Sequence, residues 1–384
     1  MTAFVYLDHH ATTPVAAEVV TAMQPWFTEE FANAASISHR AGGHVRLAVE
    51  ASRCSLAEDL GCEPEEIIFT SGATEANNLA IKGVLYAAGP AAHLVTNAAE
   101  HRAVLDPARR LQRQGYAVDI LPVTTDATIT PDSVEAALRP KTKLVSAMLA
   151  NNEVGTINDL RAIATIGRKH GAFVHTDAAQ AFGRIPIDFR ELNVDLLSVT
   201  AHKLYGPKGI GALVVNRQHG RIPIEPLLDG GGHERGLRSG TLPVPLIVGF
   251  AAAARLATRG LTAETERLAQ LRNQLLLQLR AEIPGLTVNG HSTRRLPNNL
   301  NVTIPNIDGE ALLARLQTTD LAVSSGAACS SSSPEPSHVL RAMGLNDTAA
   351  RASLRFGFGR GNTITDVDQA VHIITAALRA ISGR

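Results

Sequence analysis

Cysteine is scarce in this chain of 384 residues, which has only three, at positions 54, 62 and 329. A small and odd number of cysteines argues against a disulfide framework. The first residues, MTAFVYLDHHATTPV, lack the basic start and the apolar run of a secretory signal. No apolar stretch approaches the roughly 20 residues needed to cross a bilayer. These absences favour a reducing, cytoplasmic setting without a membrane partner.

Net charge is also missing, because 36 basic residues balance 36 acidic ones. A neutral chain has no strong field for a polyanion, so direct binding to nucleic acid is not expected. Lysine is rare, and its six copies lie at positions 82, 141, 143, 169, 203 and 208. This scarcity limits the side chains that could form a Schiff base.

Short β-rich runs alternate with helical patterns through the first two thirds of the chain. The seven runs span residues 66–70, 93–97, 116–123, 143–149, 172–176, 194–200 and 211–216. Helical patterns at 74–88 and 159–171 lie among them. This alternation predicts an α/β fold whose largely parallel sheet has helices on both faces. Ligands of such sheets bind outside the carboxyl ends of the strands.

A second, smaller domain is expected after the glycine-rich stretch LLDGGGHERGLRSGTLPVP at residues 227–245. Long helical patterns follow at 262–283 and 365–381, with further strands between them. We therefore place a domain boundary between residues 255 and 256.

Lys203 and Asp177 are candidate cofactor-binding residues, because each follows a predicted strand. Lys203, in SVTAHKLYGPKGIGALVV, could form a Schiff base with an aldehyde, although most lysines are only solvated surface groups. Asp177, in HTDAAQ, could keep a pyridine nitrogen protonated and so make the ring an electron sink, or could merely cap a helix. Gln180 could then donate to the phenolic oxygen of that ring.

A phosphate site is suggested by FTSGATEANNLAIKG, where a strand leads through a Ser-Gly-Ala-Thr turn into a helix. Backbone amides at a helix N-terminus favour phosphate, and Thr74 adds a hydroxyl, although it could be an ordinary cap. The turn lacks the Gly-Lys-Ser/Thr ending of a nucleotide-binding loop, which disfavours ATP. His101, in AAEHRAVLD, is either structural or able to stack on a ring and transfer protons.

Seven segments, in order along the chain, resemble the cysteine desulfurases of the class V aminotransferase family, which use pyridoxal phosphate. They are SGATEANNLAIKG, EHRAVLD, NNEVGTI, HTDAAQAFG, TAHKLYGPKGIGAL, GGGHERGLRSGT and SSGAACSSSSPEPSHVLRAMGLND. The resemblance implies the pyridoxal-phosphate-dependent transferase fold type I. Its large domain, with a mainly parallel seven-stranded sheet, would span residues 13–255. A smaller α+β domain would combine residues 1–12 with residues 256–384.

The resemblance also implies a role for each motif residue. Lys203 would hold the cofactor as a Schiff base, Asp177 would pair with the pyridinium nitrogen, and Gln180 would bind the phenolic oxygen. His101 would stack on the ring. The phosphate would be bound by Ala73 through its amide and by Thr74, Thr200, His202 and Thr241. In the family this last threonine comes from the other subunit, so a homodimer with shared active sites is expected.

The resemblance places the substrate L-cysteine against Asn152 and an arginine. A guanidinium suits a carboxylate because its planar fork binds both oxygens. In ARASLRFGFGR the candidates are Arg351, Arg355 and Arg360, and the register of the motif favours Arg355 over Arg351.

Cys329 lies in SSGAACSSSSPEPSH, whose small residues and prolines predict an exposed, mobile loop. The resemblance makes its thiolate the nucleophile that takes the sulfur of L-cysteine as a persulfide and leaves L-alanine, with Lys203 and His101 moving protons. The persulfide would pass to an acceptor protein or an iron–sulfur scaffold. No permanent metal is expected, although Cys329 could ligate an iron–sulfur cluster transiently with such a scaffold. Cys54 and Cys62 are interpreted as structural.

Rival interpretations remain at this point. Another class V reaction, transamination or selenocysteine lysis, would use the same lysine, and transamination needs no loop cysteine. A non-catalytic relative would bind partners only. A metal site at His9 and His10 has no close ligand cluster in the sequence to support it.

Overall fold

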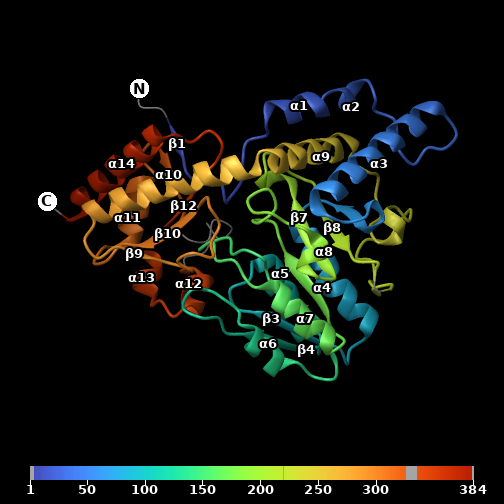
Figure 1. Ribbon diagram of the computed structural model, residues 1–384, viewed down its shortest axis with the longest axis horizontal. Helices are drawn as coiled ribbons and strands as arrows, with labels where there is room; N and C mark the ends of the chain where they lie inside the picture. Colours follow the sequence, from blue (N-terminus) through green and yellow to red (C-terminus); the bar gives the residue numbers. More distant parts are fainter. Residues whose placement is uncertain (1–3, 219, 326–334, 383–384) are drawn as a thin grey trace.

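The computed structural model describes residues 4–218, 220–325 and 335–382. Its elements form a larger lobe around β2 to β8 and a smaller lobe around β9 to β12, with α10 running into the smaller lobe from the end of α9 (Figure 1). Cys329 lies outside the described residues.

The larger lobe is built on a sheet of seven strands. They are β2 (Ile67–Thr70), β3 (His93–Asn97), β4 (Ala117–Leu121), β5 (Thr142–Ser146), β6 (Phe173–Asp177), β7 (Leu196–Thr200) and β8 (Gly211–Val215). Their order is β2-β8-β7-β6-β5-β3-β4, and β8 runs antiparallel to both of its neighbours. The other pairs are parallel. The predicted mainly parallel sheet of seven strands is therefore confirmed.

Helices cover both faces of this sheet. They are α1 (Ala17–Met23), α2 (Pro25–Thr28), α3 (Arg40–Leu60), α4 (Ala73–Ala88), α5 (Arg102–Arg113), α6 (Pro131–Ala137), α7 (Leu160–Lys169), α8 (Phe189–Leu192) and α9 (Val244–Arg259). Three short 3-10 turns, η1 (Pro64–Glu66), η2 (Ala201–Lys203) and η3 (Glu234–Gly236), connect longer elements.

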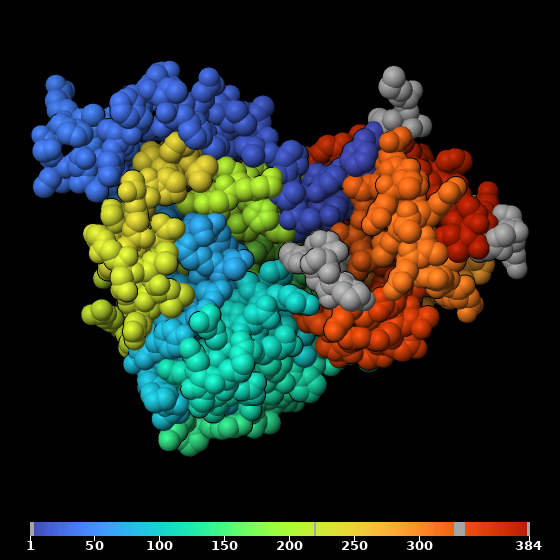
Figure 2. All heavy atoms as spheres, turned by 180° about the vertical axis from the view of Figure 1, so that it is seen from behind, coloured from blue at the N-terminus to red at the C-terminus, as the bar shows by residue number. Residues whose placement is uncertain are grey.

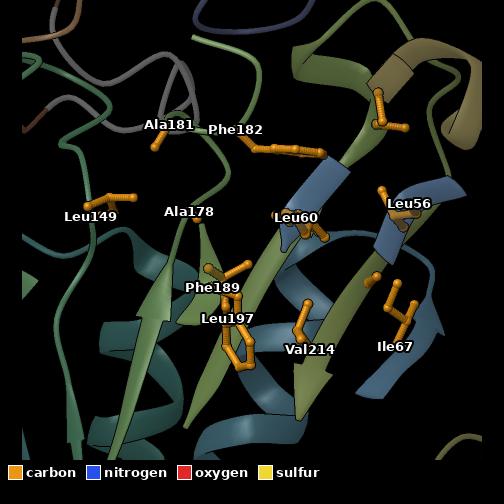
Figure 3. Packing of buried hydrophobic residues seen from close by; sticks show 14 of the residues in the cluster. Leu56, Leu60, Ile67, Leu149, Ala178, Ala181, Phe182, Phe189, Leu197 and Val214 are labelled. Carbon is orange, nitrogen blue, oxygen red and sulfur yellow. The ribbon is translucent and has the colours of Figure 1, made fainter. Parts of the chain in front are cut away.

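Neighbouring strand residues belong to separate cores, because successive side chains point to opposite faces of a sheet. Leu196 and Leu213 pack with α4 and α5. Leu197 and Val214 pack on the other face with α3, α7 and α9 (Figure 3). Since strands buried on both faces carry apolar residues at nearly every position, their sequences appear as continuous apolar runs rather than alternating ones.

The smaller lobe combines short strands with helices, and its strand pairs are antiparallel except for the parallel pair β1 and β11. Its elements are β1 (Val5–Tyr6), α10 (Leu261–Glu282), β9 (Thr287–Val288), β10 (Asn299–Thr303), α11 (Gly309–Leu316), β11 (Leu321–Ala322), α12 (His338–Ala342), α13 (Asp347–Arg351), β12 (Ser353–Gly357) and α14 (Ile364–Ser382). β10 pairs with β9 and β12, and the N-terminal β1 pairs with β11. Val5 and Leu7 join the core of this lobe, which otherwise comes from residues 268–377. The division into two domains stays a prediction.

The two lobes are joined by the break between α9 and α10 at Gly260. Across the described ranges no single helix is long and apolar enough to cross a membrane; α9 and α10, bent by 73°, meet that test of length and composition only as a pair.

Candidate functional site

The predicted site residues converge on one cavity of about 440 Å³ at the carboxyl ends of the strands. Ten of them line it: Ala73, Thr74, His101, Asn152, Asp177, Gln180, Thr200, His202, Lys203 and Arg355. Thr241 is exposed and does not line the cavity of its own chain. The convergence follows from topology, because parallel strands end at the same edge of the sheet.

Lys203 ends the 3-10 turn that follows β7, and backbone oxygens surround its ammonium group. Its Nζ donates to the carbonyls of His10 and of Ala11, the latter at 2.8 Å. Arg184 also fixes this turn by donating from Nη2 to the Lys203 carbonyl at 2.9 Å. The N-terminal segment therefore forms one wall of the site, which no motif in the sequence had indicated.

His202 lies beside this lysine and contacts the same N-terminal segment. Its Nδ1 is 3.2 Å from the hydroxyl of Thr12. Burial, together with the positive charges of Lys203 and Lys208, lowers the pKa of His202 to about 4. The imidazole is therefore neutral near pH 7 and can act as a hydrogen-bond partner without carrying charge.

Asp177 is the last residue of β6, and its carboxylate is held on both oxygens. Oδ2 accepts from Nδ2 of Asn77 at 2.6 Å, and Oδ1 accepts from the amide of Ala179 at 2.9 Å. Asn77 is fully buried on α4, one helical turn after Thr74. Sequence reasoning missed Asn77, although its spacing of three from Thr74 places it on a neighbouring part of the helix surface.

Gln180 is fixed by His10 through two hydrogen bonds. Oε1 of Gln180 lies 2.9 Å from His10 Nδ1, and its Nε2 donates to the His10 carbonyl at 3.0 Å. Burial, followed by the charges of Arg355 and Lys203, lowers the pKa of His10 well below its usual value. His10 thus positions an amide, and the described residues contain no group of three or more side chains suited to a metal ion.

The start of α4 lines the cavity beside Thr200. Gly72 precedes the helix with φ of 149°, and a Cβ atom there would still lie 3.8 Å from Thr200 Oγ1. Gly211 has no such room, since its Cβ would lie 2.7 Å from the Gly72 Cα. These glycines leave the first amides of α4 open to an anion. The residues present therefore fit an aldehyde cofactor that carries a phosphate and a ring nitrogen.

The glycine-rich stretch 227–245 is attached to the same helix end. Arg238 donates from Nε to Glu75 on α4 at 2.8 Å, and Glu75 also accepts from the amide of Ser71. Thr241 follows three residues after this arginine on the exposed surface. The salt bridge thus fixes the base of the segment that presents Thr241.

Of the three candidate arginines, Arg355 is the one that lines the cavity. It lies on β12, and its side chain is only 2% exposed. Arg351 instead pairs with Glu310 outside the cavity, and the guanidinium carbon of Arg360 lies 4.6 Å from the centre of the Tyr205 ring. The geometry therefore favours Arg355 for a substrate carboxylate.

Two neighbouring residues, Glu100 and His101, have side chains set by specific contacts. His101 caps α5, and its Nδ1 accepts from the amide of Ala103 at 3.0 Å, which puts the proton of a neutral ring on Nε2.

Glu100 is fully buried and accepts at 2.6 Å from both Asn97 Nδ2 and the Met148 amide. Burial raises the pKa of Glu100 to about 8. The hydrogen bond from the Met148 amide lowers this pKa, and the negative charge of Asp177 raises it.

Glu100→Gln should therefore remove a pH dependence of stability. Between about pH 4.5 and pH 8 the folded protein holds a proton on Glu100 that the unfolded chain has lost. Unfolding then releases a proton, so the free energy of unfolding falls by about 1.4 kcal/mol per pH unit as pH rises. Above about pH 8 the Glu100 carboxyl is ionised in both the folded and the unfolded protein, and its contribution to stability has been lost completely.

Urea unfolding of the wild type and of Glu100→Gln at pH 5.5, 6.5 and 7.5 measures this slope. We expect the stability of the wild type relative to the variant to decline steadily across the series. Glu310→Gln, at an exposed carboxylate, is the control and should follow the wild type. If the free energies of unfolding of the wild type and Glu100→Gln changed in parallel with pH, Glu100 would be ionised in the folded protein.

Known proteins resemble this chain over almost its whole length. The family model for aminotransferase class-V matches residues 5–370. A protein of Anaeromyxobacter dehalogenans (strain 2CP-C) named cysteine desulfurase IscS is 48% identical over 98% of this chain and 93% of its own. A solved structure described as a NifS-like protein superposes with a TM-score of 0.91 at 36% identity, covering 98% of this chain and 99% of its own. Another solved structure, described as SspA in complex with cysteine, superposes with a TM-score of 0.82 at 36% identity, covering 92% of this chain and 98% of its own.

Proposed function

Because the chain belongs to the class V aminotransferase family and is a cysteine desulfurase, we propose that it binds pyridoxal phosphate at Lys203 and transfers the sulfur of L-cysteine to Cys329. Members of this family depend on pyridoxal phosphate in general. The observation that carries the proposal is the convergence of Lys203, Asp177 and Arg355 on one cavity that also receives the N-terminus of α4.

The cofactor would be held at both of its ends. Lys203 would bind its aldehyde, Asp177 its ring nitrogen and Gln180 its phenolic oxygen, with His101 against the ring. Ala73, Thr74, Thr200 and His202 would bind its phosphate, together with Thr241 from a second subunit. When bound, the cofactor supplies an electron sink that stabilises negative charge at the substrate Cα. Asn77 keeps Asp177 oriented for this role through the 2.6 Å hydrogen bond.

The substrate would be oriented by its carboxylate at Arg355 and by Asn152. Asn152 belongs to the segment after β5, and its carbonyl accepts from Arg355 Nη1 at 3.1 Å, so the two groups are held together. Lys203 would move the proton at Cα as a neutral amine, since its side chain lines the cavity. His101 would assist with a second proton.

The sulfur step balances without another reactant. The thiolate of Cys329 forms a bond to the sulfur of L-cysteine, the substrate C–S bond breaks, and one proton replaces sulfur on carbon. L-cysteine and the enzyme thiol thus become L-alanine and an enzyme persulfide. The persulfide would then pass to an acceptor protein or an iron–sulfur scaffold, where Cys329 could transiently ligate the cluster. We place this homodimeric enzyme in the cytoplasm.

A product assay tests this function. L-cysteine with dithiothreitol should yield L-alanine and sulfide in a ratio of one to one, because each persulfide reduced by the dithiol releases one sulfide. An elimination enzyme would give pyruvate and ammonia with the sulfide, and an aminotransferase would give a keto acid without sulfide. Pyruvate in place of alanine would overturn the proposal. L-serine, which lacks the sulfur, is the control substrate and should yield no alanine.

A further inference from the structure

Asp8 lies where the N-terminal segment crosses the strand that carries Arg355. The amide of His9 donates to the Gly357 carbonyl at 3.0 Å, and the Gly357 amide donates to the Leu7 carbonyl at 2.7 Å. A Cβ atom on Gly357 would lie 2.7 Å from the His10 nitrogen, so this close crossing requires glycine. Figure 2 shows the N-terminal segment in dark blue between the two lobes. The backbone of Asp8 is therefore locked to β12.

The guanidinium of Arg355 is buried and only partly bonded. Nη2 donates to Asp8 Oδ1 at 2.8 Å, and Nη1 donates to the Asn152 carbonyl at 3.1 Å. Nε is buried, with no hydrogen-bond partner among the described residues. A guanidinium has five N–H donors, so with Nε buried, one N–H on Nη1 and one on Nη2 remain for a ligand. Asp8 also balances the charge of a side chain that is only 2% exposed, where an unpaired charge would be costly.

We propose that Asp8 is a positioning residue for substrate binding, which holds one edge of Arg355 so that its remaining N–H groups meet the α-carboxylate of L-cysteine. The inference rests on the proposed function and adds to it a residue outside the motifs considered for the site. A carboxylate binds an arginine strongly only when the planar fork is correctly oriented. Asp8 and Asn152 fix that orientation from two different segments of the chain.

The role requires a hydrogen-bond acceptor at position 8 rather than a negative charge. The substrate brings a second carboxylate to Arg355, and Asp8 repels that charge while holding the fork. Asparagine keeps an acceptor oxygen at nearly the same place and removes the repulsion. Alanine removes the acceptor and leaves Arg355 free to turn away. Asp8→Asn should therefore retain substrate binding, and Asp8→Ala should lose it.

Steady-state kinetics of the holoenzyme test the inference. Asp8→Ala should raise KM for L-cysteine by about 10- to 100-fold, because a hydrogen bond to a charged group contributes binding free energy of this size. The kcat of this variant should stay within about threefold of the wild-type value. Asp8→Asn should keep KM within about threefold of the wild type. Asp8→Glu, which displaces the carboxylate by one methylene, should also raise KM. This variant replaces Asp8→Ala in the test if Asp8→Ala does not fold. Glu310→Ala removes the carboxylate from another arginine pair and should leave KM unchanged.

Two inhibitors separate positioning from a general structural defect. Cysteamine has the amine and thiol of cysteine without the carboxylate, and L-alanine keeps the carboxylate without the sulfur. Asp8→Ala should weaken inhibition by L-alanine as much as it raises KM, while cysteamine should inhibit equally well. Equal weakening of both inhibitors, or an unchanged KM, would overturn the inference alone. A wild type that makes no alanine from L-cysteine would instead overturn the proposed function.

Discussion

Cys329→Ser should lower the release of alanine and sulfide from L-cysteine by roughly 100-fold or more, while the cofactor stays bound. A serine hydroxyl is not ionised near neutral pH and cannot carry sulfur as a persulfide. The residues proposed to hold the cofactor lie elsewhere in the sequence, so the visible spectrum of the bound cofactor should match that of the wild type. The measurement combines product assays under dithiothreitol with an absorbance spectrum of each purified protein.

The other two cysteines supply the controls for this experiment. Cys54 is exposed, and Cys54→Ser should keep full activity. Burial, together with the charge of Glu66, raises the pKa of Cys62 to about 12, so its thiol stays protonated and is a poor nucleophile. A Cys329→Ser enzyme that still released alanine and sulfide at the normal rate would show that this thiol is not the sulfur carrier.

Lys203→Ala should abolish covalent cofactor binding and reduce activity by roughly 1,000-fold or more, because it removes the amine that forms the Schiff base. Borohydride reduction of the wild type should attach pyridoxal phosphate to Lys203, and peptide mass spectrometry locates the adduct. The variant should show no such adduct. Free cofactor could still occupy the cavity, since Asp177, Gln180 and the start of α4 are unchanged.

Lys208 is the second lysine that lines the cavity, which makes it the matched comparison. Lys208→Ala should retain the borohydride adduct on Lys203. An adduct on Lys208 in the wild type would contradict the assignment of Lys203. Lys203 differs from Lys208 in that the carbonyls of His10 and Ala11 hold its ammonium group against the N-terminal wall.

Much of the sheet could be predicted because its strands are short apolar runs separated by helical periodicity. The predicted run at 93–97 coincides with β3, and the run at 211–216 exceeds β8 by one residue. No helix was predicted at the start of α3, because residues 39–43 are mostly polar or glycine. His39 caps this helix by accepting from the Gly42 amide, a local contact that is easily overlooked in the sequence.

The residues of the site could also be predicted in large part, because several of the motifs directly follow a strand. Lys203 follows β7, Asp177 ends β6, and the turn before Ala73 follows β2. Parallel strands bring these ends to one edge of the sheet, so motifs far apart in the sequence face one cavity. The sequence alone therefore determined which residue types meet there, and the resemblance assigned them their chemistry.

The tertiary structure alone decided how those groups are held and which arginine joins them. Arg351 and Arg355 are only four residues apart, yet one belongs to α13 outside the cavity and the other to β12 inside it. Asp8 and Arg355 are separated by 347 positions and still meet at 2.8 Å. Local patterns carry no information about such a pair, because it forms only where the N-terminal segment packs against β12.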